Sequence, residues 1–571
     1  MKNLKTLLSI LIILTSFVSQ GQTVNYDWAS NFNGLSIGED LAIDAAGSSY
    51  STGYFADTVD FDPSSSSVLL IANGIKEDAF LTKLDANGNL LWAHKFGGPG
   101  MDKATSVTID ATGNVYFSGF FDGLVDFDPS SGVSNLNSVN GDIFICKFTA
   151  NGTLIWAKQI DGFSYNNYLS LEIDNLNNII LSGKFEGTCD FNPSSGTYNL
   201  TSNGMEDVFV LKLNSNGNFI WAKAFGGIRH DSPTAISIDG GGNVYILGGF
   251  EMTVDFDPGS GVYNLASTYN DRVVFITKLS SIGNFVWAKH FEYRGGNVIY
   301  ENDIITDNSG GVTIVGITDS AICLNPGICS STLTKSSLGG RVNSFVIKLN
   351  SNGTLNWGKM FENVNSIKSV NVDAINNIYL TGYFGEGIVD FDPGTGIYNL
   401  NGQKYVDMFI QKLNPLGDFI WVKHLPGNHE ESGKKIEINT NGDVYTIGVF
   451  YDSIDCDPGS GTDYLVDSNW YPNSFVHKMS QSGLSSINEE IDISNTIKVF
   501  PNPTNGEVYI SLENSVDELN IEVFTIKGEL VLQESYFNTD RIKLNLDNKP
   551  GIYLVRLTGS EINKMIRIIK N

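Results

Sequence analysis

Short runs in which apolar and polar residues alternate fill most of this 571-residue chain, and turn residues separate them. The clearest copy has four such runs, at residues 235–239, 243–250, 273–279 and 285–291. A period of two is typical of β-strands, and no window of helical period longer than the N-terminal segment occurs. The pattern therefore predicts an all-β chain built from units of four short strands.

The turn residues between the runs support this interpretation. In two copies Asn177 and Asn376 replace the glycine that joins the first and second runs, and Asn is the next residue most tolerant of the left-handed conformation. The pair Asn-Gly favours a tight hairpin, because both central residues of a type I′ turn have positive φ. Such pairs join the third and fourth runs at Asn87-Gly88, Asn151-Gly152, Asn216-Gly217 and Asn352-Gly353.

Two markers repeat with a nearly constant period. A tryptophan stands in the fourth run of each copy, at steps of 64, 64, 65, 66, 70 and 64 residues: Trp28, Trp92, Trp156, Trp221, Trp287, Trp357 and Trp421. Asp-Phe-Asp-Pro or a variant of it follows the second run, at residues 60–63, 126–129, 190–193, 255–258, 323–326, 390–393 and 455–458. One supersecondary unit is therefore repeated seven times, and each copy is expected to bury its apolar face against its neighbours.

The two ends of the array predict how it closes. The array opens with a lone fourth run at residues 26–32, and it ends with a third run at residues 474–479 that no tryptophan run follows. An open solenoid would leave these strand edges unpaired, whereas pairing the two runs removes them. We expect residues 24–486 to form a seven-bladed β-propeller of four-stranded blades, closed by an N-terminal latch strand, with the tryptophans as the packing cores of the blades.

The N-terminal segment is expected to direct export. Lys2 and Lys5 precede an apolar stretch at residues 7–18, and small residues follow it, so residues 1–21 fit a secretory signal peptide. The stretch is too short for a transmembrane helix, and no other segment reaches about 18 apolar residues. No transmembrane segment is therefore expected. The first cysteine is Cys146, which excludes a lipid-modified cysteine after cleavage.

After a linker at residues 487–492, residues 493–571 have a different pattern. Alternating runs at 507–512, 519–525, 529–533, 542–546, 552–557 and 565–569 predict a small β-sandwich without the 65-residue repeat. Four phrases stand in order: Val499-Phe-Pro-Asn-Pro-Thr-Asn-Gly506, Val523-Phe-Thr-Ile-Lys-Gly528, Leu546-Asp-Asn-Lys-Pro-Gly-Ile-Tyr553 and Lys564-Met-Ile-Arg-Ile-Ile-Lys570.

These phrases resemble the type A C-terminal sorting domain of proteins that use type IX secretion. The resemblance covers about 75 residues, and Thr525 departs from it where the family often has Asp. It implies a Bacteroidetes protein that enters the periplasm by its signal peptide and crosses the outer membrane with the type IX machinery as its partner. The mature protein is then expected at the outer cell surface or in the medium.

The repeats also resemble a known family. Leu91-Trp-Ala-His-Lys-Phe-Gly-Gly98, followed by Ile109-Asp-Ala-Thr-Gly-Asn-Val-Tyr116, is similar to the SBBP β-propeller repeat of secreted bacterial proteins. The resemblance covers about residues 24–486. It implies the propeller fold and carries no common catalytic motif.

The negative charge of the chain lies in the repeats. The formal net charge is −27, residues 493–571 hold nine basic and ten acidic residues, and residues 1–21 hold two lysines and no acid. The remaining residues therefore carry 25 basic against 53 acidic side chains, a balance of −28. Nucleic-acid binding is disfavoured, because phosphates need a basic surface. A cationic partner or metal ions are compatible with this field.

The Asp-Phe-Asp-Pro loops are the candidate metal sites. Loops after the second and fourth strands of a blade emerge on one face, so these loops gather there with the variable loops after the tryptophans. Clustered carboxylates suit calcium, which prefers six to eight oxygens. Alternatively, each first Asp caps its turn through backbone hydrogen bonds while the Phe packs between blades. No copy has the full calcium-loop order. The calcium candidates are Asp60, Asp62, Asp126, Asp128, Asp255, Asp257, Asp390, Asp392, Asp455 and Asp457.

Other chemical signals are weak. Cys323 and Cys329 bracket a short loop and are candidates for a local disulfide, and the other three cysteines are expected to be buried. Gly34-Leu-Ser-Ile-Gly38 has the letters of a nucleophile elbow, which needs an α/β sheet. The six histidines have no ligand or triad spacing, so the sequence identifies no catalytic and no cofactor-binding residue.

Two functions remain open. We expect a secreted or surface-exposed binding module that recognises a protein or a glycan on the acidic loop face, where the loops at residues 291–302 and 425–435 are the longest and most polar. The alternative is an exported polysaccharide-active or other propeller enzyme with its site at the ring centre. Facing carboxylates with Arg and Tyr in one central pocket would favour the enzyme.

Overall fold

A computed structural model of the chain describes residues 23–160, 169–267, 272–294, 299–307, 309–319, 321–323, 332–333, 342–467, 470–482, 498–500, 504, 506–525, 530–546, 551–559 and 563–570. Contacts divide it into two compact units, of which one spans Gln22–Ser482 and the other contains Gly483–Asn571. The signal peptide and linker predictions fall on residues 1–21 and 487–492, which lie outside the described residues.

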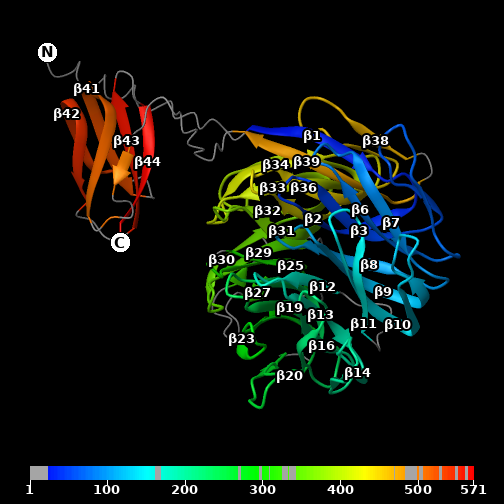
Figure 1. Ribbon diagram of the computed structural model, residues 1–571. Coiled ribbons are helices and arrows are strands. Elements are labelled where there is room, and N and C mark those ends of the chain that lie inside the picture. The colour runs from blue at the N-terminus through cyan, green and yellow to red at the C-terminus, as the bar shows by residue number, and fades with distance from the viewer. Residues whose placement is uncertain are drawn as a thin grey trace. The chain divides into compact units, whose positions relative to one another are not determined.

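The repeats fold as four-stranded antiparallel sheets, and the described residues contain seven of them (Figure 1). Asn177 and Asn376 have φ of 59° and 65°, as expected for residues that replace glycine in the turn between the first two strands. The first three sheets are β2 (Ser36–Ile43), β3 (Ser49–Phe55), β6 (Asp78–Leu84) and β7 (Leu90–Phe96); β8 (Lys103–Ile109), β9 (Val115–Asp126), β10 (Asn135–Phe148) and β11 (Leu154–Ile160); and β12 (Ser170–Ile173), β13 (Ile179–Phe185), β16 (Asp207–Leu213) and β17 (Phe219–Phe225).

The seventh sheet combines the two ends of the repeat region. Strand β1 pairs antiparallel with β39, so that Thr23 lies opposite Ser482 and Asn31 opposite Phe475. Sheets four to seven are β18 (Ser232–Ile238), β19 (Val244–Phe250), β22 (Val273–Leu279) and β23 (Phe285–Phe291); β25 (Ile299–Thr306), β26 (Val312–Thr318), β29 (Asn343–Leu349) and β30 (Leu355–Phe361); β31 (Ser366–Val372), β32 (Ile378–Asp390), β33 (Asn399–Leu413) and β34 (Phe419–Leu425); and β35 (Ser432–Ile438), β36 (Val444–Phe450), β39 (Asn473–Ser482) and β1 (Thr23–Asn31).

The connection between the second and third strands of a sheet forms a small extension of its own. In the second and sixth sheets the long strands β9, β10, β32 and β33 continue into it. In the others the extensions are β4 (Thr58–Asp60) with β5 (Leu69–Ile71), β14 (Thr188–Asp190) with β15 (Asn199–Thr201), β20 (Thr253–Asp255) with β21 (Asn264–Ala266), β37 (Ser453–Asp455) with β38 (Tyr464–Val466), and the three-stranded β24 (Tyr293–Arg294), β27 (Ala321–Cys323) and β28 (Thr332–Leu333).

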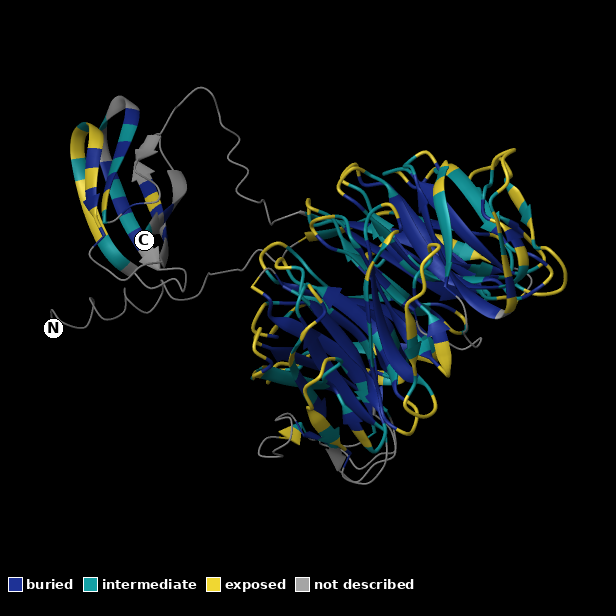
Figure 2. Cartoon of the chain, turned by 60° about the horizontal axis from the view of Figure 1, so that its bottom comes forward, coloured by how far each residue is buried: buried dark blue, intermediate teal, exposed yellow. Residues whose placement is uncertain are grey.

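Neighbouring sheets pack face to face in chain order. The first strand of each sheet contacts the first strand of the next, and β35 of the seventh sheet contacts β2 of the first. Each apolar cluster holds residues of two sheets, as where Phe32, directly after β1, lies 5.1 Å from Phe61 between ring centroids. The sheets are buried and the loops around them are exposed (Figure 2). These all-β sheets are consistent with the blades of a β-propeller.

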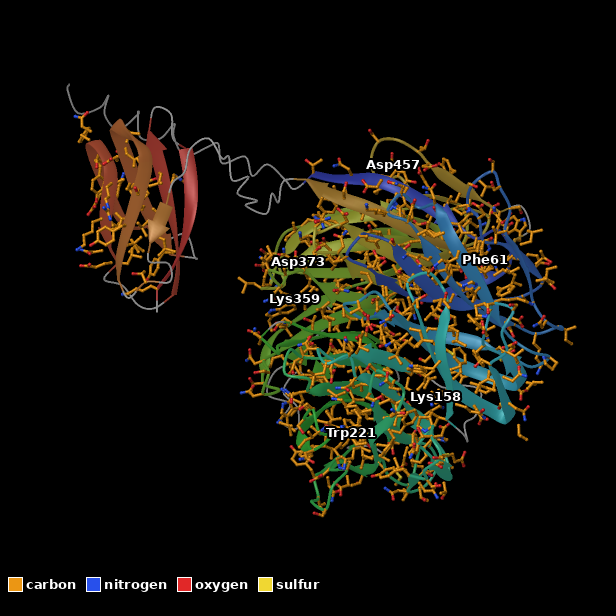
Figure 3. The ribbon with its side chains drawn as sticks, in the orientation of Figure 1. Phe61, Lys158, Trp221, Lys359, Asp373 and Asp457 are labelled. Atoms are coloured by element: carbon orange, nitrogen blue, oxygen red, sulfur yellow. The ribbon has the colours of Figure 1, made fainter. Side chains whose placement is uncertain are left out.

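The tryptophans lie between the sheets, which corrects the expectation that they form the packing cores. Six of the seven are half-buried, and only Trp421 is buried. Each of six indoles covers the turn glycine of the next sheet. A Cβ on Gly283 would lie 3.1 Å from the ring of Trp221 (Figure 3). The cores consist mainly of Phe, Ile, Leu and Val; Trp421 belongs to one of them, and the other six tryptophans pack against them from the margin. Glycine is therefore needed in this turn for its positive φ and for the indole above it.

The C-terminal unit is one connected sheet around its own core. Its strands are β40 (Lys498–Phe500), β41 (Glu507–Thr525), β42 (Leu530–Asn545), β43 (Gly551–Gly559) and β44 (Asn563–Lys570). The runs predicted at 507–512 and 519–525 belong to a single strand, as do those near 530 and 542–546. An irregularity between Ser511 and Val516 separates the halves of β41, and both halves contribute to one apolar cluster. The separate short strands predicted there are therefore corrected.

Candidate functional site

Hydrogen bonds to backbone N–H groups hold the Asp-Phe-Asp-Pro loops. Oδ1 of Asp60 accepts from the N–H groups of Asp62 at 3.1 Å and Val68 at 2.8 Å. Oδ1 of Asp62 accepts from the N–H of Ser64 at 2.9 Å. The same contacts recur in four further loops, at Asp126 and Asp128, Asp255 and Asp257, Asp390 and Asp392, and Asp455 and Asp457. These bonds match the turn-capping alternative.

The apolar position of the motif is fully buried. Phe61 packs against Phe55 and Phe80, and Cys456 takes the place of the ring in the seventh sheet. Burial would raise the pKa of Asp60, but hydrogen bonds from Ser67 and two backbone N–H groups outweigh it and lower the pKa. The carboxylates of these loops therefore already accept hydrogen bonds from their own turns.

Among the described residues, no group of three or more His, Cys, Asp and Glu side chains is arranged to hold a metal ion. Calcium at the ten aspartates stays a prediction, which a paired substitution can test.

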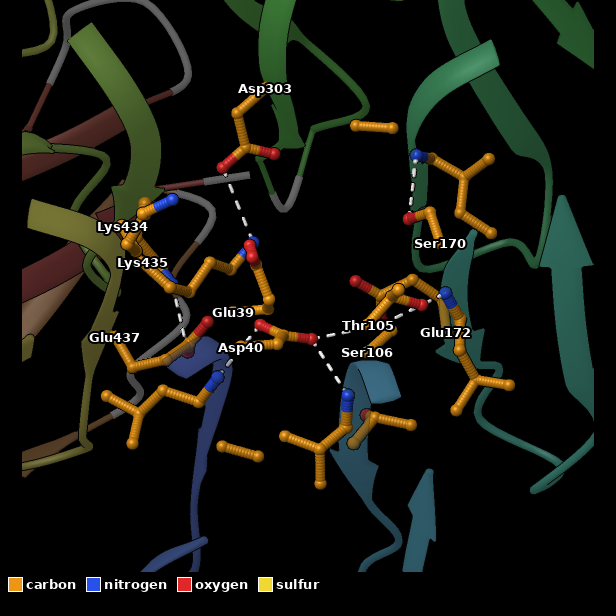
Figure 4. Close-up of a pocket in the computed structure, with 18 of the residues that line it drawn as sticks. Glu39, Asp40, Thr105, Ser106, Ser170, Glu172, Asp303, Lys434, Lys435 and Glu437 are labelled. Atoms are coloured by element: carbon orange, nitrogen blue, oxygen red, sulfur yellow. Dashed lines mark hydrogen bonds and ion pairs between the residues drawn. The ribbon is translucent and has the colours of Figure 1, made fainter. Parts of the chain in front are cut away.

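A polar cavity of about 420 Å³ lies where the first strands of the seven sheets meet (Figure 4). All seven strands contribute to its lining, which is mostly Ser, Thr, Asn and charged side chains. Its carboxylates and lysines are Glu39, Asp40, Glu172, Asp303, Lys368, Lys434, Lys435 and Glu437. No Arg or Tyr is among the described lining residues. Of the carboxylates, Arg and Tyr expected at the centre of an enzyme, the cavity therefore has only the carboxylates.

A belt of hydrogen bonds between sheets fixes the middle of this lining. We define the belt residues as the position in each first strand whose side chain faces the next sheet: Asp40, Ser106, Ser170, Ala235, Asp303, Ser369 and Lys435. Five of them accept from a backbone N–H of the following sheet, as Asp40 Oδ2 does from Val107 at 2.8 Å and Ser106 Oγ from Leu171 at 3.2 Å. The other three acceptors are Ser170, Asp303 and Ser369.

Two belt positions carry a side chain that offers no such acceptor. After Lys435 the N–H of Leu41 is accepted by Asp40 Oδ1 at 2.9 Å. The carboxylate of Asp40 thus accepts from an N–H of its own sheet and from one of the next sheet, and it stabilises the contact between them.

The charges of the cavity centre on Lys435. Its Nζ lies 3.3 Å from Oδ2 of Asp303. Burial would lower the pKa of Lys435, but the surrounding carboxylates, Asp303 first, outweigh it and raise the pKa. Burial raises the pKa of Glu172 to about 7 and that of Glu437 to about 8. The cavity therefore holds three lysines, of which Lys435 pairs with Asp303, and two carboxyl groups with a pKa near neutral pH, so it suits a polar ligand that both donates and accepts hydrogen bonds.

Sequence reasoning did not identify these residues. The belt positions recur with the period of the repeat. Because each repeat supplies only one of them, no local sequence motif predicts the cavity. The available signal was a polar residue at the same register of the first strand in six of the seven repeats.

The remaining candidates have structural surroundings. Ser36, of the elbow-like phrase, is buried in β2, where its Oγ accepts from the N–H of Ser474 at 3.1 Å. Cys323 is disulfide-bonded, and Cys329 lies outside the described residues. The prediction that the other three cysteines are buried is confirmed: Cys146, Cys189 and Cys456.

The C-terminal unit has a family match. Residues 498–571 match the family model described as the secretion system C-terminal sorting domain. This confirms the sorting-domain prediction: the chain carries a type IX sorting domain, which indicates export to the cell surface or the extracellular space. The described part of the chain contains no helix that is long and apolar enough to cross a membrane.

Three curated relatives match parts of the chain. An uncharacterized WD repeat-containing protein of Acanthamoeba polyphaga mimivirus is 22% identical over 317 residues, 52% of this chain and 18% of that protein. The regulatory protein FlaEY of Caulobacter vibrioides is 21% identical over 359 residues, which are 59% of this chain and 36% of that protein. An endo-acting ulvan lyase of Formosa agariphila is 30% identical over 81 residues, 14% and 15%. The matched part thus spans well under half of each relative.

Among solved structures, a fungal alcohol oxidase of the AA5 family, in complex with copper, aligns with a TM-score of 0.36 at 10% identity. The alignment covers 96% of this chain and 99% of that chain.

Proposed function

We propose that this protein is an exported binding module, a closed seven-bladed β-propeller of the SBBP type that recognises a protein or glycan with its loop face. The seven sheets would be the blades, and β1 the latch that completes the last of them. The contact of β35 with β2, the pairing of β1 with β39 and the WD-repeat relative support this architecture.

The observation that favours binding over catalysis is the engagement of three of the five central carboxylates, since Glu437 also accepts from Nδ2 of Asn371 at 2.9 Å. Asp40 and Asp303 each accept backbone N–H groups from two sheets, and Asp303 also pairs with Lys435. Such groups are not free to act as a general base or nucleophile. Recognition then falls to the exposed loops.

A binding screen with an activity readout tests the proposal. The full-length mature protein is applied to glycan and protein arrays with calcium and with chelator, and incubated with the polysaccharides that it binds. We expect retention without the release of new reducing ends or unsaturated products. Turnover of any bound polysaccharide would overturn the binding-module proposal in favour of the enzyme.

A further inference from the structure

Four aromatic side chains meet on the loop face of the sixth and seventh sheets. The rings of Tyr405 and His429 are stacked with centroids 4.3 Å apart, Tyr451 lies 5.8 Å from His429, and Trp470 stands perpendicular to His429 at 5.7 Å. We call Tyr405, His429, Tyr451 and Trp470 the aromatic rim. They come from β33, from the connection of β34 to β35, from the residue after β36 and from the connection of β38 to β39.

Two of the four rim residues, Trp470 and Tyr405, are exposed, and His429 and Tyr451 are half-buried. Trp470 is 61% and Tyr405 40% exposed, and the adjacent Tyr471 is 47% exposed. Contiguous exposed apolar surface of this kind marks interaction sites, and Trp and Tyr are the side chains that most often anchor a ligand.

Backbone strain holds the outermost ring in place. Trp470 has φ of 62°, a left-handed conformation that costs of order 1–3 kcal/mol for a non-glycine residue. The chain beyond it is fixed, because Oδ2 of Asp467 accepts from the N–H of Tyr471 at 3.2 Å and from Nδ2 of Asn473 at 2.7 Å. A bulky indole kept at the surface in a strained conformation indicates a use for that indole.

A charged group borders the rim. Burial, and then the charge of Glu430, raises the pKa of Tyr451, so an exposed carboxylate stands beside that ring. Glu430 also follows His429 directly in the chain. The rings therefore adjoin a hydrogen-bond acceptor as well as one another.

We propose that the aromatic rim binds a neutral oligosaccharide. This inference rests on the proposed binding function and names its ligand class. The ligand must offer apolar faces to separate rings and hydrogen-bonding groups at its edges, and a pyranose ring does both. The exposed carboxylate of Glu430 beside the rings disfavours an apolar chain, which would bury that charge. The acidic balance of the repeats disfavours uronic-acid or sulfated polymers.

Affinity electrophoresis and calorimetry of the full-length mature protein test the rim. The probes are laminarin and xylan as neutral polysaccharides and alginate as an acidic one. We expect a neutral polymer to bind, Trp470→Ala and Tyr405→Ala to weaken it about tenfold or more, and Trp470→Phe to retain most of the affinity. Tyr464→Ala removes an aromatic ring that is 58% exposed outside the rim, and it should bind as the parent does. Melting curves establish that each variant is folded.

The outcomes separate the two proposals. Equal binding by Trp470→Ala and the parent, or binding of alginate alone, would overturn the rim as the site of a neutral glycan. Absence of any saccharide binding together with a specific protein partner would overturn the rim and leave the binding-module proposal standing. Turnover of the polymer would overturn the binding-module proposal itself.

Discussion

Asp303 supplies the hydrogen-bond acceptor that Ala235 lacks. At five of the seven junctions of the belt a Ser or Asp side chain reaches the N–H of the next sheet, but the methyl group of Ala235 cannot. Between the fourth and fifth sheets the N–H of Ile304 is accepted by Oδ1 of Asp303 at 2.9 Å, while Oδ2 of the same carboxylate accepts from Val370 at 3.1 Å. Where a belt residue cannot accept a hydrogen bond, the belt residue of the next sheet is therefore an aspartate: Asp303 after Ala235, and Asp40 after Lys435.

Asp303→Ala should lower the free energy of unfolding by about 3–5 kcal/mol, because it leaves two N–H groups and the buried ammonium of Lys435 without their acceptor. Adding Ala235→Ser should recover about 1 kcal/mol, since the new hydroxyl can accept from Ile304. Urea titrations of the two single variants and the double variant measure the coupling. Additive changes would contradict the belt.

The sequence predicted the sheets well because their signals are local. An Asn-Gly turn or an alternating run acts within a few residues, as Gly88 and Asn177 do. The belt was not predictable in the same way, since Asp40 and Val107 meet across 67 residues. The aromatic rim comes from four separate connections, and no spacing along the chain links Tyr405 to Trp470. The position of the tryptophans was mispredicted because an apolar aromatic run fits a core and a contact between sheets equally well.

Removal of residues 24–33 should abolish the cooperative unfolding of the repeat unit. The deletion takes away β1, Phe32 and the indole of Trp28, whose Nε1 donates to the carbonyl of Ala86 in the first sheet at 3.0 Å. It exposes the edge of β39 in the seventh sheet, because β39 is the strand with which β1 pairs. Removing the exposed loop residues 194–197 is the control and should lower the melting temperature by only a few degrees. A deletion variant that melts as cooperatively as the parent would exclude the latch.

The paired substitution Asp126→Asn with Asp128→Asn distinguishes turn capping from calcium binding. Asparagine keeps the Oδ1 acceptor for the N–H groups of Ser134 and Ser130 and loses the charge. Capping alone predicts nearly parental melting with calcium or with chelator, whereas changing both aspartates to Ala should lower the melting temperature in either buffer, because the capping acceptors are lost. A loss by the Asn pair in calcium only would establish a metal site.

The stability of the repeat unit should fall as the pH rises from 5 to 8. Burial raises the pKa of Asp78 to about 6, of Asp102 to about 7 and of Glu431 to about 8. Because these folded-state values exceed the unfolded ones, their stabilising contribution is complete below the unfolded pKa and is lost as the pH passes the folded pKa. Burial lowers the pKa of His477 to about 4 and also lowers the pKa of His94, which opposes the trend below pH 6.5 but with fewer groups.

Asp78→Asn tests this pH dependence, because the amide resembles the protonated carboxyl. The variant should melt higher than the parent at pH 8 and nearly as the parent does at pH 5. Thermal melts at half-unit pH intervals give the comparison. An unchanged slope of melting temperature against pH in the variant would show that Asp78 does not titrate in this range.

The C-terminal unit should act as an export address that is separable from binding. Residues 498–571 match the sorting-domain family, and the unit has its own apolar core. Its basic and acidic residues are nearly equal in number, whereas the repeats are strongly acidic. Truncation before residue 493 should leave the protein in the periplasm of a cell that has type IX secretion, and it should leave the belt intact, because every belt contact lies within Gln22–Ser482.

Grafting residues 493–571 onto a reporter with a signal peptide should carry the reporter across the outer membrane. Immunoblots of periplasm, surface and medium measure both, with a reporter that carries the signal peptide alone as the control. Normal surface levels of the truncated protein would show that export does not depend on this unit.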